Sequence, residues 1–165
     1  MKTIRKYFWF LPTVIWMVVI FNFSGQPGEE SAGLSLQVTQ QIVKIVKHLG
    51  VTDKDTEELT EILHPAVRKA AHMTEYAILY ILLFLSFFFI VHAVRSAALS
   101  ILIAFAYACL DETHQLFVQG RGGTFMDVCV DMTGVVFAVA LVLFIYSSWQ
   151  ARQFSKNEKQ ASQID

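Results

Sequence analysis

Acidic, basic and histidine residues stand at helical spacing in three stretches of the chain that are otherwise apolar. In the first stretch, Arg68, His72 and Glu75 follow one another at i, i+4 and i+7, which places them on one face of a helix. Similar spacing recurs in Asp111, His114 and Gln115, and again in Asp127, Asp131 and Gly134. A charged side chain at bilayer depth is costly, so such residues normally face a protein interior and mark a site.

Three more polar residues, Lys69, Glu112 and Arg121, lie beside these positions. We call the complete set the polar layer: Arg68, Lys69, His72, Glu75, Asp111, Glu112, His114, Gln115, Arg121, Asp127 and Asp131. One interpretation of the layer is structural. Lipid gives helices no hydrophobic reason to associate, so buried polar contacts can hold a membrane bundle together.

A second interpretation is a binding site for an anionic or lipid-linked envelope molecule. Arg68, Lys69 and Arg121 would engage its phosphate or carboxylate, with each arginine offering a bidentate fork. The remaining ligand-binding candidates supply further hydrogen bonds: His72, Gln115 and Asp127.

A third interpretation is an enzyme that transfers or hydrolyses a phosphoryl group on a lipid-linked substrate. Burial can move the pKa values of neighbouring carboxyl and imidazole groups apart, which divides acid and base roles between them. The candidate catalytic residues are Glu75, Asp111, Glu112, His114 and Asp131. His72, Asp111, His114 and Asp131 are also the candidate metal ligands, although no motif identifies a metal or a cofactor. An intramembrane proton relay ranks last, because the charges gather at one level.

The composition points to a membrane protein. The 165 residues are 55% hydrophobic and 16% charged, with a mean hydropathy of +0.48, whereas soluble domains carry about 25% charged residues. The formal net charge is only −1, and no basic stripe or stacking platform for nucleic acid is present. We therefore expect the lipid bilayer to be a partner and nucleic acid not to be one. The oligomeric state is not predicted.

Four segments are long and apolar enough to cross a membrane, which needs about 20 residues. We predict an all-α integral membrane protein with spans near residues 7–23, 70–91, 96–118 and 126–146. Pro12 is expected to kink the first span, and Pro65 to open the helix that becomes the second. The connecting residues 24–69 contain an amphipathic helical pattern, typical of a helix that lies on the membrane or caps the bundle.

Basic residues in the short flanks predict the orientation, because they favour the cytoplasmic side. They precede the first span, fill the turn between the second and third, and follow the fourth: Lys2, Arg5, Lys6, His92, Arg95, Arg152, Lys156 and Lys159. Both termini are therefore expected in the cytoplasm, and residues 24–69 outside. The polar residues 147–165 would form a cytoplasmic tail, disordered from Arg152 on.

Three strings carry a family resemblance: FNFSGQPG, VRKAAHMTEYAIL and YACLDETHQLFVQGRGGTFMDVCVDMTG. They resemble the VanZ-like integral membrane proteins, whose namesake is linked to reduced susceptibility to the glycopeptide teicoplanin. The resemblance implies that residues 7–146 form a VanZ-like membrane domain and that the chain acts at the cell envelope. It also implies that all eleven residues of the polar layer match the shared motif.

Overall fold

A computed structural model describes residues 8–161, and the side chains of residues 8–156, as a set of five helices. They are α2 (Phe10–Ser24), α3 (Gly28–His48), α4 (Thr56–Phe88), α5 (Ala93–Gln115) and α6 (Phe125–Ala161). The described residues contain no strand, which confirms the all-α class. Some residues used in the predictions lie outside the described residues. They are Lys2, Arg5 and Lys6, which support the predicted orientation, and Tyr7, the start of the predicted first span.

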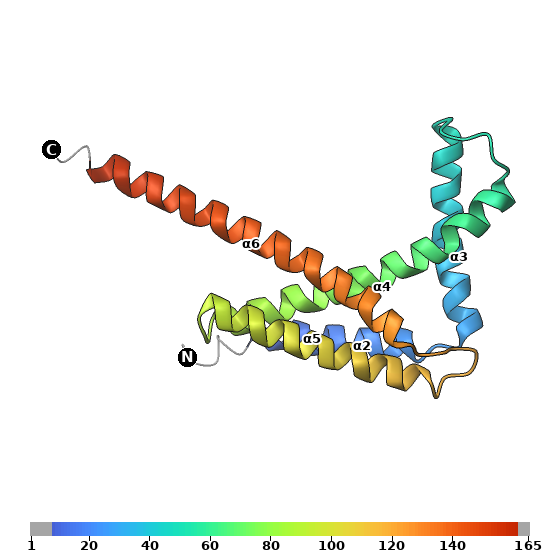
Figure 1. Cartoon of the computed structure of the whole chain (residues 1–165), viewed down its shortest axis with the longest axis horizontal. Helices are drawn as coiled ribbons and strands as arrows, with labels where there is room; N and C mark the ends of the chain where they lie inside the picture. Colours follow the sequence, from blue (N-terminus) through green and yellow to red (C-terminus); the bar gives the residue numbers. More distant parts are fainter. Residues whose placement is uncertain (1–7, 162–165) are drawn as a thin grey trace.

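Helix α4 is the centre of the molecule and packs against each of the other four helices. Helices α2 and α5 run beside it, α6 crosses it, and α3 stands across the end of the bundle (Figure 1). The core forms where these helices meet, around Tyr76, Leu79, Tyr80 and Leu83 of α4. The second half of α6 extends away from the bundle (Figure 1).

Small residues allow the close approach of α4 and α6. Gly134 of α6 lies against the backbone of Met73, and a Cβ atom built on this glycine would stand only 1.9 Å from the Met73 carbonyl oxygen. Ala104 and Ala108 of α5 and Ala138 of α6 are also buried in the core. Helix interfaces in membranes favour such residues, because close backbone packing replaces the hydrophobic drive that lipid does not supply.

The two prolines do not act as predicted. Pro12 lies in the first turn of α2, where its missing N–H has no intrahelical partner to lose, so it opens the helix. Pro65 lies inside α4, which continues through it from Thr56 to Phe88. Packing of α3 on the N-terminal part of α4 offsets the lost hydrogen bond: Leu59 is buried, and His64 Nε2 lies 2.9 Å from Ser35 Oγ.

Three helices are long and apolar enough to span a membrane: α4, α5 and the Phe125–Lys156 part of α6. Helix α2 has 15 residues and is about 22 Å long, shorter than a hydrocarbon core of about 30 Å. Together with α3 it meets the same test, although the two helices are bent by 107°. The chain is therefore a multi-pass helical membrane protein with three spans, or up to four if the bent pair counts as one.

The connection after α2 contains the predicted amphipathic helix, now bounded as α3. The expectation of a disordered tail from Arg152 on is wrong for residues 152–161, because α6 continues to Ala161. No glycine or proline follows Gly134, so nothing in the sequence ends the helix early.

Buried hydroxyls occupy the end of the bundle where α4 turns into α5. We call Thr13, Ser86, Ser96 and Ser100 the hydroxyl cluster. Thr13 Oγ1 and Ser86 Oγ lie 2.9 Å apart, and Ser86 also donates to the Trp9 carbonyl at 2.8 Å. Ser96 and Ser100 donate to carbonyl oxygens one turn earlier in their own helix. Each hydroxyl of this cluster therefore has a partner.

Candidate functional site

The polar layer gathers at the opposite end of the bundle. Helix α4 contributes residues from its middle, α5 from its last turn, and α6 from its first turns, with the loop between α5 and α6 closing over them. Asp111 lies 18 residues after Ala93 at the start of α5, which is about 27 Å along the helix. This distance nearly equals the thickness of a bilayer core, so the layer sits close to one membrane surface.

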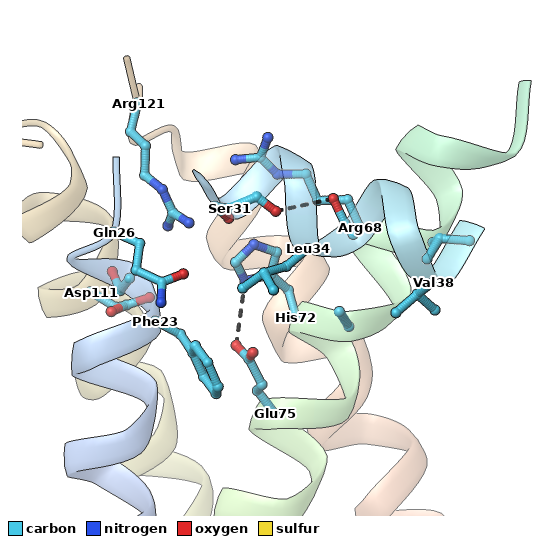
Figure 2. A pocket seen from close by; sticks show the side chains of 14 residues that line it. Phe23, Gln26, Ser31, Leu34, Val38, Arg68, His72, Glu75, Asp111 and Arg121 are labelled. Atoms are coloured by element: carbon cyan, nitrogen blue, oxygen red, sulfur yellow. Dashed lines mark hydrogen bonds and ion pairs between the residues drawn. The ribbon is translucent and has the colours of Figure 1, made fainter. Parts of the chain in front are cut away.

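A cavity of about 230 Å³ opens between α2, α3 and α4 (Figure 2). Its lining combines polar and apolar residues: Phe23, Ser24, Gln26, Ser31, Leu34, Ser35, Val38, Val67, Arg68, Ala71, His72, Glu75, Asp111 and Arg121. We call it the first cavity. In Figure 2, Arg121, Gln26 and Asp111 lie on one side of it and Val38 on the other.

Arg121 is the least expected feature of the first cavity. It comes from the loop between α5 and α6, and its Nε and Nη1 atoms are buried without a hydrogen-bond partner. Burial, and then the neighbouring charge of Arg68, lower the pKa of Arg121. Among the described residues, no carboxylate oxygen lies within 4.0 Å of a nitrogen of either arginine. The loop thus holds the Arg121 guanidinium at the cavity without a close carboxylate partner among the described residues.

Other buried polar atoms around the arginines also have no hydrogen-bond partner among the described residues. They are Ser24 Oγ, His72 Nδ1, Tyr76 Oη, Asp111 Oδ1, His114 Nδ1 and Asp131 Oδ2. Native proteins pair nearly all such atoms, and each exception asks for an explanation. Ser24, His72 and Asp111 line the first cavity, so several of the unpaired atoms gather at one place in the bundle.

His72 lies between two carboxylates. Its Nδ1 atom is 3.7 Å from Glu75 Oε2 and 4.0 Å from Asp131 Oδ1. These distances allow charge attraction but exceed a hydrogen bond. The Asp131 side chain is 1% exposed, whereas His72 and Glu75 are 23% and 22% exposed. A histidine flanked by two carboxylates can exchange a proton with a bound molecule.

A second cavity of about 220 Å³ lies on the α5 and α6 side of the same residues. Its lining comprises Pro65, Arg68, Lys69, His72, Glu112, Gln115, Gly122, Asp127, Val130 and Asp131. Arg68 and His72 line both cavities. These two side chains therefore separate two polar spaces, and a ligand in either one would meet them.

Hydrogen bonds fix the acidic end of α5. Gln115 Nε2 donates to Asp111 Oδ2 and to Glu112 Oε1, both at 3.2 Å. The Thr124 N–H donates to Glu112 Oε2 at 3.1 Å, which ties the loop to α5. Gly123 makes that approach possible, because a Cβ atom there would lie 1.9 Å from the Glu112 carbonyl oxygen.

A second glycine contact joins this loop to the corner between α2 and α3. The Gly28 N–H donates to the Gln119 carbonyl at 3.0 Å. Gly120 has a φ of +73°, which favours glycine, and a Cβ atom on Gly28 would lie 2.1 Å from the Gly120 carbonyl oxygen. The loop that carries Arg121 is thereby held beside the start of α3.

Ten of the eleven residues of the polar layer line one of the two cavities. The exception is His114, whose ring stacks on Phe21 of α2 at a centroid distance of 4.3 Å, away from both linings. Asp127 has a structural contact as well. Its Oδ2 accepts a hydrogen bond from Thr124 Oγ1 at 2.7 Å, and its N–H donates to that oxygen at 3.2 Å, so Thr124 acts as an N-cap residue at the start of α6.

The sequence analysis missed three aromatic residues beside the site. Tyr76 is fully buried one turn after His72, and that spacing was the signal that would have found it. Tyr107 Oη donates to the Met17 carbonyl at 2.6 Å, and Trp16 Nε1 donates to the Glu75 carbonyl at 2.9 Å. The last two hydrogen bonds connect α2 to α5 and to α4, and nothing in the local sequence predicts them.

Within the described residues, no group of three or more His, Cys, Asp or Glu side chains is arranged to hold a metal ion. The predicted metal candidates divide accordingly. His72 and Asp131 approach each other, while His114 turns toward Phe21.

Comparison with known proteins identifies the family. The family model described as VanZ/LLP1 matches residues 8–147, which is most of the chain. No curated protein and no solved structure matches. The chain belongs to the VanZ/LLP1 family, as the three sequence strings predicted.

Proposed function

We propose that this VanZ/LLP1 family member binds the anionic group of a cell-envelope molecule in the first cavity. The observation that carries the proposal is Arg121, a half-buried arginine with two buried nitrogen atoms that no described residue pairs. Buried N–H donors without an acceptor are costly, so an anion that accepts hydrogen bonds from them would stabilise the loop, and this supports the proposal.

The charges around the cavity favour an anion with hydrogen-bonding groups. Arg68 and Arg121 line it together, and a phosphate or carboxylate between them could accept bidentate hydrogen bonds. Glu75 and Asp111 line the same cavity and can accept hydrogen bonds from hydroxyl or amine groups of the ligand. Such a set suits a glycan or lipid precursor of the envelope, or an antibiotic that resembles its ligand.

We further infer the orientation of the site. Four spans, with α2 as the first, and cytoplasmic termini would place the polar layer at the extracytoplasmic surface, where envelope precursors and glycopeptides meet the cell. The positive flanks of the predicted spans support this orientation. Engagement of a precursor there would lower the access of teicoplanin to its target.

The binding proposal is tested with glycerol phosphate as the probe, titrated by calorimetry into the protein purified in an uncharged detergent. Arg121→Ala should weaken binding at least tenfold, because one charge-assisted contact of this kind contributes about 1.5 kcal/mol or more. Arg95→Ala is the matched control, since this exposed arginine lies at the other end of the bundle. Equal affinity of the wild type and Arg121→Ala would refute the proposal.

One observation favours a second candidate function, hydrolysis or phosphoryl transfer on a lipid-linked substrate. His72 lies between Glu75 and Asp131, in reach of both cavities. For an enzyme, His72→Asn should abolish phosphate release from a prenyl phosphate while glycerol phosphate still binds. If the wild-type protein releases no phosphate from this substrate, the enzymatic alternative fails and the binding proposal is unaffected.

A further inference from the structure

Helix α3 has three faces rather than two. At about 100° per residue, Ser35, Thr39 and Val43 share one face, and Thr39 and Val43 are fully buried. A second face is apolar yet exposed, and we call it the apolar stripe: Leu34, Val38, Ile42, Ile45 and Leu49. The third face carries the charged and amide residues, among them Lys44 and Lys47. Only one half of the apolar side of α3 therefore packs against protein.

The apolar stripe begins inside the first cavity. Leu34 and Val38 belong both to the stripe and to the cavity lining. The other apolar residues of the lining are Phe23, Val67 and Ala71. From Leu34 to Leu49, the residue that follows α3, the whole stripe is about 22 Å long at a rise of about 1.5 Å per residue, and it extends beyond the cavity. The cavity thus has a charged side at Arg121 and an apolar side at Leu34 and Val38 of α3 (Figure 2).

The direction of α3 makes the apolar stripe accessible from the bilayer. The 107° bend after α2 turns α3 out of the direction of the bundle, so that it runs across the end where the polar layer lies (Figure 1). A helix with a polar face, here with Lys44 and Lys47 near its end and Glu29 and Glu30 at its start, and an exposed apolar face is the type that lies in a membrane interface. Lipid chains at that level would meet the stripe directly.

We propose that the ligand of the first cavity is an anionic membrane lipid, whose charged headgroup is bound by Arg68 and Arg121 while one of its chains lies along the apolar stripe. This inference rests on the proposed function and specifies its ligand class. A soluble anion would satisfy the arginines but leave Leu34 and Val38 without a partner, whereas a lipid satisfies both sides of the cavity.

The experiment compares a lipid with its own headgroup. The full-length protein in an uncharged detergent is titrated with phosphatidylglycerol and with phosphatidylcholine, and bound lipid is counted by native mass spectrometry. Glycerol phosphate binding is measured separately by calorimetry. We expect phosphatidylglycerol to bind at least tenfold more tightly than both phosphatidylcholine and glycerol phosphate.

Two variants separate the stripe from the charged side. Ile45→Asn should weaken phosphatidylglycerol at least fivefold and leave glycerol phosphate unchanged, because Ile45 belongs to the stripe and lines neither cavity, whereas Arg121→Ala should weaken both. Ile62→Asn is the matched control, because Ile62 is 52% exposed and Ile45 60%, and Ile62 lies on α4 outside the stripe and outside both cavities. Ile62→Asn should change neither affinity, and all three variants are compared at equal thermal stability.

The possible failures are distinguishable. Equal affinity for phosphatidylglycerol and glycerol phosphate would overturn the lipid inference and leave the anion-binding proposal standing. The same holds if Ile45→Asn weakens both probes equally, since the stripe would then act only by holding the cavity in shape. If neither probe binds the wild type, both proposals fail.

Discussion

The two ends of the bundle bury polar groups in opposite ways. In the hydroxyl cluster, Thr13, Ser86, Ser96 and Ser100 each find a partner within hydrogen-bond distance. In the polar layer, Arg121, Asp111 and Asp131 keep buried atoms without one among the described residues. The first arrangement holds helices together. The second costs stability unless something else completes it, which is why we assign function to that end.

The charges at the two ends sharpen the contrast. The hydroxyl cluster contains only neutral donors, which can turn back to carbonyl oxygens of their own helix. Guanidinium and carboxylate groups cannot satisfy themselves in this way. A layer that served only to hold the helices would gain from closer pairing of Arg121 with Asp111, and the structure does not make that pair.

The largest expected effect comes from Gly134→Ala, which would remove the scaffold of the polar layer. The new Cβ atom would lie 1.9 Å from the Met73 carbonyl oxygen, and backbone cannot move aside as a side chain can. We expect a loss of about 3 kcal/mol or more in the free energy of unfolding, seen as a lower melting temperature. Gly33→Ala is the control, since no atom lies within 4 Å there. Equal melting of both variants would contradict the close packing of α4 and α6.

A smaller effect should follow from Ser86→Ala in the hydroxyl cluster. The substitution removes the contacts with Thr13 and the Trp9 carbonyl and leaves Thr13 with one weaker bond. Polar contacts between membrane helices contribute about 0.6 kcal/mol each, so the free energy of unfolding should fall by about 1 kcal/mol. Binding of glycerol phosphate should be unchanged. A loss of binding without a loss of stability would break the distinction between the two ends.

A matched pair of tyrosines tests the same distinction near the site. Tyr107→Phe removes the hydrogen bond to the Met17 carbonyl and should cost about 0.6 kcal/mol. Tyr76→Phe removes a buried hydroxyl without a partner, so stability should hold or rise. Chemical denaturation in detergent compares them directly. A larger loss for Tyr76→Phe would mean that its hydroxyl is paired after all.

The smallest expected change in stability is that of Asp131→Asn. The side chain is 1% exposed, its Oδ2 has no partner among the described residues, and its Oδ1 lies 4.0 Å from the imidazole Nδ1 of His72. Replacing the charge with an amide of the same shape should change the free energy of unfolding by less than about 1 kcal/mol, because the lost attraction and the lost desolvation cost offset each other. Thermal melting measures this change. A fall of several kcal/mol in the free energy of unfolding would indicate that the polar layer has a structural role.

Helical periodicity in the sequence was sufficient to predict much of this molecule. The period of 3.6 residues decides which side chains share a face, so the set Arg68, His72 and Glu75 could be predicted before any fold was known. The predicted segments after residue 70 and the amphipathic α3 appear as helices for the same reason. Membership of the VanZ/LLP1 family was also predictable, because the motif residues lie close together in the chain.

The partner that each helical face contacts was decided only by tertiary packing. His114 shares a helical face with Asp111, yet it stacks on Phe21, because α2 passes beside that turn of α5. Pro65 reads locally as a helix start, yet contacts from α3 carry α4 through it. Arg121 lies in the loop between α5 and α6, and close glycine contacts hold this loop near α2, α3 and α4. Because these segments are distant in the sequence, the sequence alone could not show that two nitrogen atoms of Arg121 lack a partner. Periodicity fixes the direction of a side chain, but only packing between distant segments decides whether it finds a partner.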